Sequence, residues 1–199
     1  MQKEITHLRR RLAEFKAYGY DILKERNFAF AKAGLQKNKD VLEVGTGRGY
    51  MALTLAQKGF SLTTIDQDGK VQQSARAIIR YYKASRKVKF KVMNAECLRF
   101  KDNSFAYILA VNFLHHAKNP VRCLREMMRV ANEKIVIVDM NKRGARILEK
   151  VHAQEGHCHE RSKIGFPEIR EVFCKAGVYV KTYRSRCQTV IIAQKGERR

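Results

Sequence analysis

The chain is poor in acidic residues, in proline and in tryptophan. Its 199 residues include 19 Asp and Glu, two Pro and no Trp, against 41 Lys and Arg. The resulting net charge of +22 favours partners that carry phosphates, carboxylates or acidic lipid headgroups. Hydrophobic residues make up 45%, which is ordinary for a globular protein and excludes disordered and collagen-like classes.

Long apolar runs and paired cysteines are also missing. No stretch approaches about 18 consecutive apolar residues, and the opening MQKEITHLRRRLAEF lacks the apolar core of a secretory signal, so we expect a cytoplasmic protein with no transmembrane segment. Five cysteines without a CxxC pair argue against a disulfide framework and a four-cysteine zinc site. Three histidines and Cys158 crowd into residues 152–159, but their spacing fits no standard zinc pattern, and we expect no metal.

Strand-like and helix-like patterns alternate along most of the chain. We expect amphipathic helices within 3–33, then strands at 41–44, 62–65, 88–92, 105–111 and 135–139, with helices at 49–58, 69–83 and 120–130. Asn119 is the expected N-cap of the last of these helices, with Pro120 at its first position. Helix-like segments at 142–152 and 167–176 lead into two final strands, 177–183 and 188–195. This alternation predicts a parallel α/β sheet closed by an antiparallel pair. We expect one domain over 1–199, with a helical cover at 1–38 and the core at 39–199.

A glycine-rich loop follows the first expected strand. Gly45, Gly47 and Gly49 stand at alternate positions, so the backbone turns tightly and approaches a ligand at the start of the next helix. A dinucleotide site would read GxGxxG, whereas Tyr50 stands where its third glycine belongs. A nicotinamide-dependent oxidoreductase is therefore disfavoured.

Asp66 ends the second expected strand, about twenty residues after the glycine loop. In doubly wound folds a carboxylate at this offset accepts hydrogen bonds from ribose hydroxyls. We expect Asp68 to cap the following helix, which leaves Asp66 for the ligand. The loop and Asp66 together predict a nucleoside-containing cofactor.

Three segments, in this order, resemble a known family. Residues 43–49 (EVGTGRG) resemble the first motif of class I S-adenosylmethionine-dependent methyltransferases, and residues 94–105 (NAECLRFKDNSF) resemble their D-A-E-x-L-P-F-x-D-x-S-F segment. Residues 112–116 (NFLHH) resemble the x-x-L-H-H of the subgroup that includes ubiquinone and menaquinone biosynthesis methyltransferases. The resemblance implies a Rossmann-like seven-stranded sheet of order 3-2-1-4-5-7-6 with helices on both faces, the N-terminal helices covering the cofactor.

The resemblance also implies where S-adenosylmethionine binds. Glu43 and the glycines would frame its methionine part, Asp66 its ribose, and Asn94, in place of the family's acid, its adenine. Asn112 would lie near the methionyl group. The complete expected set is Glu43, Gly45, Thr46, Gly47, Gly49, Asp66, Gln67, Asn94, Ala95, Glu96 and Asn112.

Methyl transfer from a sulfonium is an in-line displacement, so few catalytic groups are required. If the acceptor needs a general base, His116 is the first candidate and His115 the second, with Asp139 at the same sheet edge. We expect a small-molecule acceptor. RNA methylation, suggested by the charge, and a noncatalytic S-adenosylmethionine-binding role remain alternatives, and the oligomeric state stays open.

The densest basic stretch is residues 80–91, with six cations, three aromatic residues and no acid. It could bind nucleic acid. We favour a solvated outer strand whose lysines prevent edge-to-edge pairing.

Overall fold

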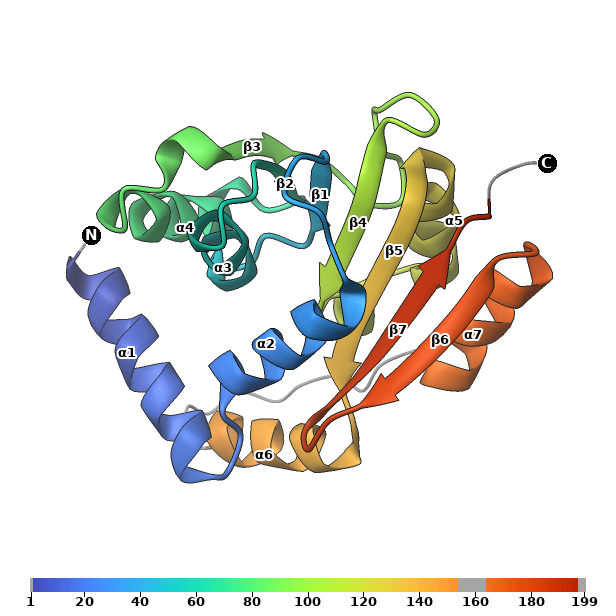
Figure 1. The fold of residues 1–199 in the computed structure, drawn as a ribbon. Helices are drawn as coiled ribbons and strands as arrows, with labels where there is room; N and C mark the ends of the chain where they lie inside the picture. The colour runs from blue at the N-terminus through green and yellow to red at the C-terminus, as the bar shows by residue number, and fades with distance from the viewer. Residues whose placement is uncertain (1, 154–163, 197–199) are drawn as a thin grey trace.

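Seven strands form one sheet in the order β3-β2-β1-β4-β5-β7-β6 (Figure 1). The computed structural model describes residues 2–153 and 164–196. Strands β1 to β5 are mutually parallel, and β7 runs antiparallel to both β5 and β6. The predicted strand order is confirmed. The strands are β1 (Val41–Val44), β2 (Leu62–Asp66), β3 (Val88–Val92), β4 (Phe105–Val111), β5 (Ala131–Met140), β6 (Tyr179–Arg184) and β7 (Gln188–Gln194).

Helices cover both faces of the sheet, as expected (Figure 1). They are α1 (Gln2–Ala17), α2 (Ile22–Ala33), α3 (Tyr50–Gln57), α4 (Gly69–Tyr81), α5 (Pro120–Val130), α6 (Lys142–Ala153) and α7 (Phe166–Lys175), with short 3₁₀ turns at Ser85–Lys87 and Leu114–His116. Among these helices none is long and apolar enough to cross a membrane.

Alternate side chains of the central strands enter two separate hydrophobic clusters. Tyr107 and Leu109 of β4 pack with residues of α1, α2, α3 and α4. Ile108, which lies between them in the chain, packs on the opposite face with residues of α5 and α7. Period-two alternation places successive side chains on opposite faces. Because both faces are covered, β1 is buried at all four positions, as its apolar sequence predicted.

Local capping residues set several helix boundaries. Asp68 accepts hydrogen bonds from the amides of Lys70 and Val71 at the start of α4, and Asn119 caps α5 with Pro120 in its first turn. Both predictions are confirmed. The predicted start of the fifth strand at residue 135 was wrong, because α5 ends at Val130 and β5 begins at once with Ala131. The segment 131–134 lacks a Pro-Gly turn that would separate the two elements.

Strand β3 forms one edge of the sheet, which confirms the interpretation of residues 80–91 as a sheet edge. Lys89 and Lys91 are exposed there, and the Arg76 guanidinium lies 4.4 Å from the centroid of the Phe90 ring. Charged side chains on an outer strand oppose pairing with another chain.

The N-terminal helices are tied to the C-terminal hairpin. Gly34 ends α2 in the left-handed conformation, and α2 crosses the face of β4, β5 and β7 (Figure 1). The buried carboxylate of Glu25 accepts hydrogen bonds from the Ser185 hydroxyl and the Cys187 amide. The cover therefore rests on the sheet through polar contacts as well as apolar packing.

Candidate functional site

The loop between β1 and α3 requires glycine at two positions where the backbone meets other residues. Gly45 and Gly49 have φ of +87° and +77°. A Cβ on Gly45 would stand 2.6 Å from Cδ2 of Phe113, and one on Gly49 would stand 2.7 Å from Cβ of Ala75. These contacts exclude any side chain, so the loop lies directly against its neighbours. Between them, Gly47 presents its amide toward β2.

A chain of buried polar side chains supports this loop from below. The Thr64 hydroxyl donates to Oε2 of Glu43 at 2.5 Å and lies 2.7 Å from Oγ1 of Thr46. The Gln72 amide donates to the same Thr46 oxygen at 3.2 Å. Because Glu43, Thr64, Thr46 and Gln72 are buried and joined by hydrogen bonds, the loop is held in one conformation.

Glu43 is 1% exposed, and burial raises the pKa of its carboxyl to about 8. The hydrogen bond from Thr64 and the nearby Arg26 guanidinium act in the opposite direction but do not outweigh burial. A buried carboxyl of this kind is a partner for a cationic group brought by a ligand.

Arg26, on α2, was missed by the sequence analysis. It is 9% exposed, donates to the Tyr50 backbone oxygen at 3.3 Å and lies 5.5 Å from the centroid of the Tyr50 ring. Burial lowers the pKa of its guanidinium to about 10. The sequence signal for it was weak, because Arg26 is one of many cations on an amphipathic helix. Neither α1 nor α2 contributes a residue to the lining of the adjacent cavity, so these N-terminal helices contact the glycine loop from outside that cavity.

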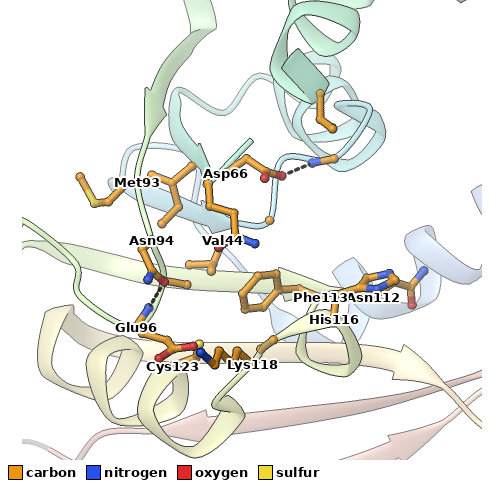
Figure 2. Close-up of a pocket in the computed structure, with 17 residues that line it drawn as sticks. Val44, Asp66, Met93, Asn94, Glu96, Asn112, Phe113, His116, Lys118 and Cys123 are labelled. Carbon is orange, nitrogen blue, oxygen red and sulfur yellow. Dashed lines mark hydrogen bonds between the residues drawn. The ribbon is translucent and has the colours of Figure 1, made fainter. Parts of the chain in front are cut away.

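Asp66 is oriented toward the loop by two backbone amides. Its Oδ2 accepts from Gly47 N at 2.9 Å (Figure 2). Its Oδ1 accepts from Asp68 N at 3.0 Å. Each carboxylate oxygen retains a second lone pair for a ligand hydroxyl. Binding of a ribose by Asp66 stays a prediction.

Asn94 and Glu96 form the next wall of the cavity. The side-chain oxygen of Asn94 accepts from the Glu96 amide at 2.9 Å (Figure 2). Oε1 of Glu96 accepts from Asn119 N at 3.0 Å. The oxygen expected to meet adenine thus already has one partner, and its other lone pair remains for a ligand N–H.

The opposite wall follows β4. Asn112 adopts φ +50° and donates its backbone amide to Val138 O at 2.8 Å. A non-glycine residue in the left-handed region carries strain, which clusters at functional sites. The Phe113 ring and the His116 imidazole lie beside it (Figure 2). Phe113, which packs against Gly45, was missed although it immediately follows the predicted Asn112.

These walls enclose a cavity of about 330 Å³, within the range of small-molecule sites. It lies at the carboxyl ends of parallel strands, where such sheets bind ligands. Its lining comprises Val44, Gly45, Gly47, Ile65, Asp66, Gln67, Val71, Met93, Asn94, Ala95, Glu96, Asn112, Phe113, His116, Ala117, Lys118 and Cys123.

Eight of the eleven predicted cofactor residues therefore line one cavity. The other three, Glu43, Thr46 and Gly49, lie under or behind the glycine loop, where they support it. Of the two candidate bases, His116 lines the cavity and His115 does not. His157 and His159 of the histidine-rich segment, with Cys158, lie outside the described residues.

His115 is instead held by Asp139. Its Nδ1 lies 2.9 and 3.0 Å from the two carboxylate oxygens, and both side chains are largely buried. The His115 and His116 ring centroids are 4.0 Å apart. The carboxylate fixes the orientation of His115, and His115 packs against the imidazole that faces the cavity.

A family model described as "Methyltransferase domain" matches residues 42–155, more than half of the chain. The chain belongs to the class I S-adenosylmethionine-dependent methyltransferases. S-adenosylmethionine is the cofactor of this family, and the site fits it: a strained glycine loop faces an oriented carboxylate at the ribose offset, within a cavity of suitable size.

The methyltransferase resembles curated proteins with different substrates. It is 30% identical over 97 residues to norajmaline N-methyltransferase of Rauvolfia serpentina, covering 48% of this chain and 33% of that protein. It is 29% identical over 92 residues to tRNA U34 carboxymethyltransferase of Nautilia profundicola, covering 46% and 30%. The chain thus spans about a third of the length of these relatives.

Among solved structures, magnesium protoporphyrin IX methyltransferase of Synechocystis PCC 6803 with bound SAH has a similar fold. The TM-score is 0.67 at 15% identity, over 87% of this chain and 83% of that one. At this identity the likeness concerns the fold. The family is thus defined, whereas the relatives' acceptors differ from one another.

Proposed function

We propose that this methyltransferase transfers a methyl group to a small-molecule acceptor. The observation that carries the proposal is the confined polar surface beside Asn112. The Tyr20 hydroxyl accepts from Nε2 of Gln188 at 2.6 Å, and these two residues are 1% and 2% exposed. The Asn112 side chain lies near this hydroxyl, and burial raises the pKa of Tyr20. Buried side chains thus close the molecule beside Asn112 at one end of the cofactor cavity, which favours a compact acceptor over a macromolecule.

In this proposal the protein holds the donor by groups on three sides. Asp66 binds the ribose hydroxyls and Asn94 the adenine, while Glu43, behind the glycine loop, is the partner of the methionyl ammonium. When bound, S-adenosylmethionine supplies an activated methyl group on a sulfonium. The glycine loop and Phe113 bound the cavity and position the donor, which favours an in-line displacement.

His116 serves as the general base for an acceptor that must lose a proton. It lines the cavity beside Asn112, where the predicted methyl donor ends. His115 and Asp139 position it through the ring contact of 4.0 Å and the hydrogen bonds to the carboxylate. We place the acceptor in the chemical range of the ubiquinone and menaquinone subgroup on the NFLHH resemblance alone.

RNA is the second candidate acceptor. The net charge of +22 and the tRNA-modifying relative favour it. A noncatalytic S-adenosylmethionine-binding role is the third.

Tritium transfer from labelled S-adenosylmethionine into a cell extract distinguishes these candidates. The extract is separated after reaction into RNA, protein, lipid and small-molecule pools, and Asp66→Ala is the control with a weakened cofactor site. We expect label among small molecules with the wild type and little with the variant. Label in RNA would contradict the small-molecule proposal, and label in no pool would favour the noncatalytic role.

A further inference from the structure

The segment that joins β3 to β4, residues 93–104, carries the cavity wall formed by Asn94 and Glu96. All of its residues lie within the described part of the chain, and they form neither helix nor strand. Backbone N–H and C=O groups outside regular structure need partners on other elements or in solvent. Helix α5 supplies several of these partners, so the position of the wall depends on that helix.

Three charged side chains of α5 face this β3–β4 segment. Arg122, Glu126 and Arg129 follow one another at intervals of four and three residues, so they lie on one side of the helix. Nε of Arg122 donates to the Glu96 backbone oxygen at 2.9 Å. Oε2 of Glu126 accepts from the Leu98 amide at 2.8 Å. The helix thus holds the segment at two successive points.

Arg129 holds the next part of the segment. Its guanidinium donates to the backbone oxygens of Leu98 and Phe100 at 2.7 and 2.8 Å, and to Oδ1 of Asp102 at 2.8 Å. It also donates to the two carboxylate oxygens of Glu126 at 2.9 and 2.8 Å, and these hydrogen bonds lower the pKa of the Glu126 carboxyl. Hydrogen bonds between ionised groups are stronger than neutral ones, so the Glu126–Arg129 pair fixes the backbone from residue 98 to residue 102.

The same anchoring reaches Asn94 through Glu96. The Glu96 amide donates to the side-chain oxygen of Asn94 at 2.9 Å (Figure 2). This bond sets the orientation of the Asn94 amide, and it depends on where the Glu96 backbone lies. Two groups at the start of α5 hold Glu96: Arg122 donates to its backbone oxygen, and the Asn119 amide donates to its Oε1 at 3.0 Å. Asn94 therefore keeps its oxygen as the atom that faces the Glu96 amide and a ligand donor.

We infer that Arg122, together with the Glu126–Arg129 pair, positions the β3–β4 segment for recognition of the adenine amino group. None of these three described side chains lines the cofactor cavity, so they are positioning residues that act through Glu96 and Asn94. The inference rests on the proposed function, in which Asn94 binds the adenine. It adds that selectivity for a 6-amino purine is set by α5, from outside the cavity.

Calorimetry with two ligands tests this inference. S-inosylhomocysteine differs from S-adenosylhomocysteine by an oxo group in place of the 6-amino group. The wild type should bind the inosyl compound about tenfold or more weakly, because its oxo oxygen faces the Asn94 oxygen without a proton between them. Arg122→Ala should reduce this ratio to about threefold or less, because an Asn94 amide that rotates offers the oxo group its NH₂. A residue that only stabilised the fold would weaken both ligands equally and leave the ratio unchanged.

Arg125→Ala is the matched control, since it removes an exposed arginine from the same helix and leaves each of these hydrogen bonds in place. It should keep the wild-type ratio. Arg129→Lys keeps the positive charge but loses the forked contacts, and it should lower the ratio as Arg122→Ala does. Urea unfolding of each variant shows that folded proteins are compared.

An unchanged ratio in Arg122→Ala or Arg129→Lys, or an equal fall in Arg125→Ala, would overturn the inference. A wild-type ratio near one would contradict the inference together with the assignment of Asn94 to adenine. Label in RNA in the tritium assay would instead contradict the small-molecule acceptor and leave this inference standing.

Discussion

Substitution of Glu43 by Gln should stabilise the methyltransferase and weaken its cofactor binding. Burial raises the pKa of this carboxyl from 4.5 to about 8, so the folded state holds its proton where the unfolded state has lost it. Stability therefore falls as the pH rises from about 4.5 to about 8, and the loss at pH 7 is about 3 kcal/mol. A glutamine keeps the hydrogen bond to Thr64 and removes this dependence.

Urea unfolding without cofactor, between pH 5 and 8.5, measures the effect, because a bound ligand would add its own stabilisation. The free energy of unfolding of the Glu43→Gln protein should increasingly exceed that of the wild type as the pH rises, by about 3 kcal/mol at pH 7. Glu133→Gln is the control, since that carboxylate lies partly exposed beside Lys39 and its loss should change stability by less than about 1 kcal/mol. A pH-independent difference would refute the assignment of a protonated buried carboxyl.

The same Glu43→Gln protein should bind S-adenosylhomocysteine about tenfold or more weakly, because the ligand ammonium favours the ionised carboxylate and an amide cannot form that charge-assisted hydrogen bond. Greater stability with weaker binding separates a ligand-binding role from a structural one. Calorimetry at pH 7 provides this measurement, and unchanged affinity would contradict contact with the ligand ammonium.

Three further substitutions test the rest of the site. Asp66→Ala should weaken S-adenosylhomocysteine binding by about 1 to 3 kcal/mol in calorimetry, and unchanged affinity would contradict the assignment of Asp66 to the ribose. His116→Ala should lower kcat about 10²-fold or more with little change in cofactor affinity, and full turnover in the tritium assay would exclude it as the base. Gly45→Ala should lower the unfolding free energy by about 1 to 3 kcal/mol through its positive φ and the Phe113 contact, and wild-type stability in urea would contradict that geometry.

The cofactor half of the site was predictable from sequence because its signals are local. The glycine loop, Asp66 and the segment after the third strand each follow a strand, and the carboxyl ends of parallel strands meet at one edge. The alternation of buried strands and capped helices likewise predicted the sheet, including the Asp68 and Asn119 caps. Each of these signals lies within a few residues of the structure that it predicts.

The contacts of the N-terminal helices were not predictable in the same way. Arg26 and Gln188 are ordinary polar residues in a helix and a strand, and nothing nearby in sequence marks them. Their significance comes from burial and from partners far along the chain, such as Tyr20 for Gln188. The early start of β5 had a similar origin, since sheet pairing extended a strand that local pattern had placed four residues later.

The contacts between Tyr20 and Gln188, and between Glu25 and the Ser185–Cys187 turn, join segments about 160 residues apart in the chain. During synthesis, the glycine loop and Asp66 emerge well before the β6–β7 turn that anchors the N-terminal helices. The residues of the nucleoside end of the site are therefore synthesised before the last hairpin, whereas the contacts of Tyr20 and Glu25 require that hairpin. In the proposed function, the contacts beside the acceptor therefore form only when the last hairpin is complete.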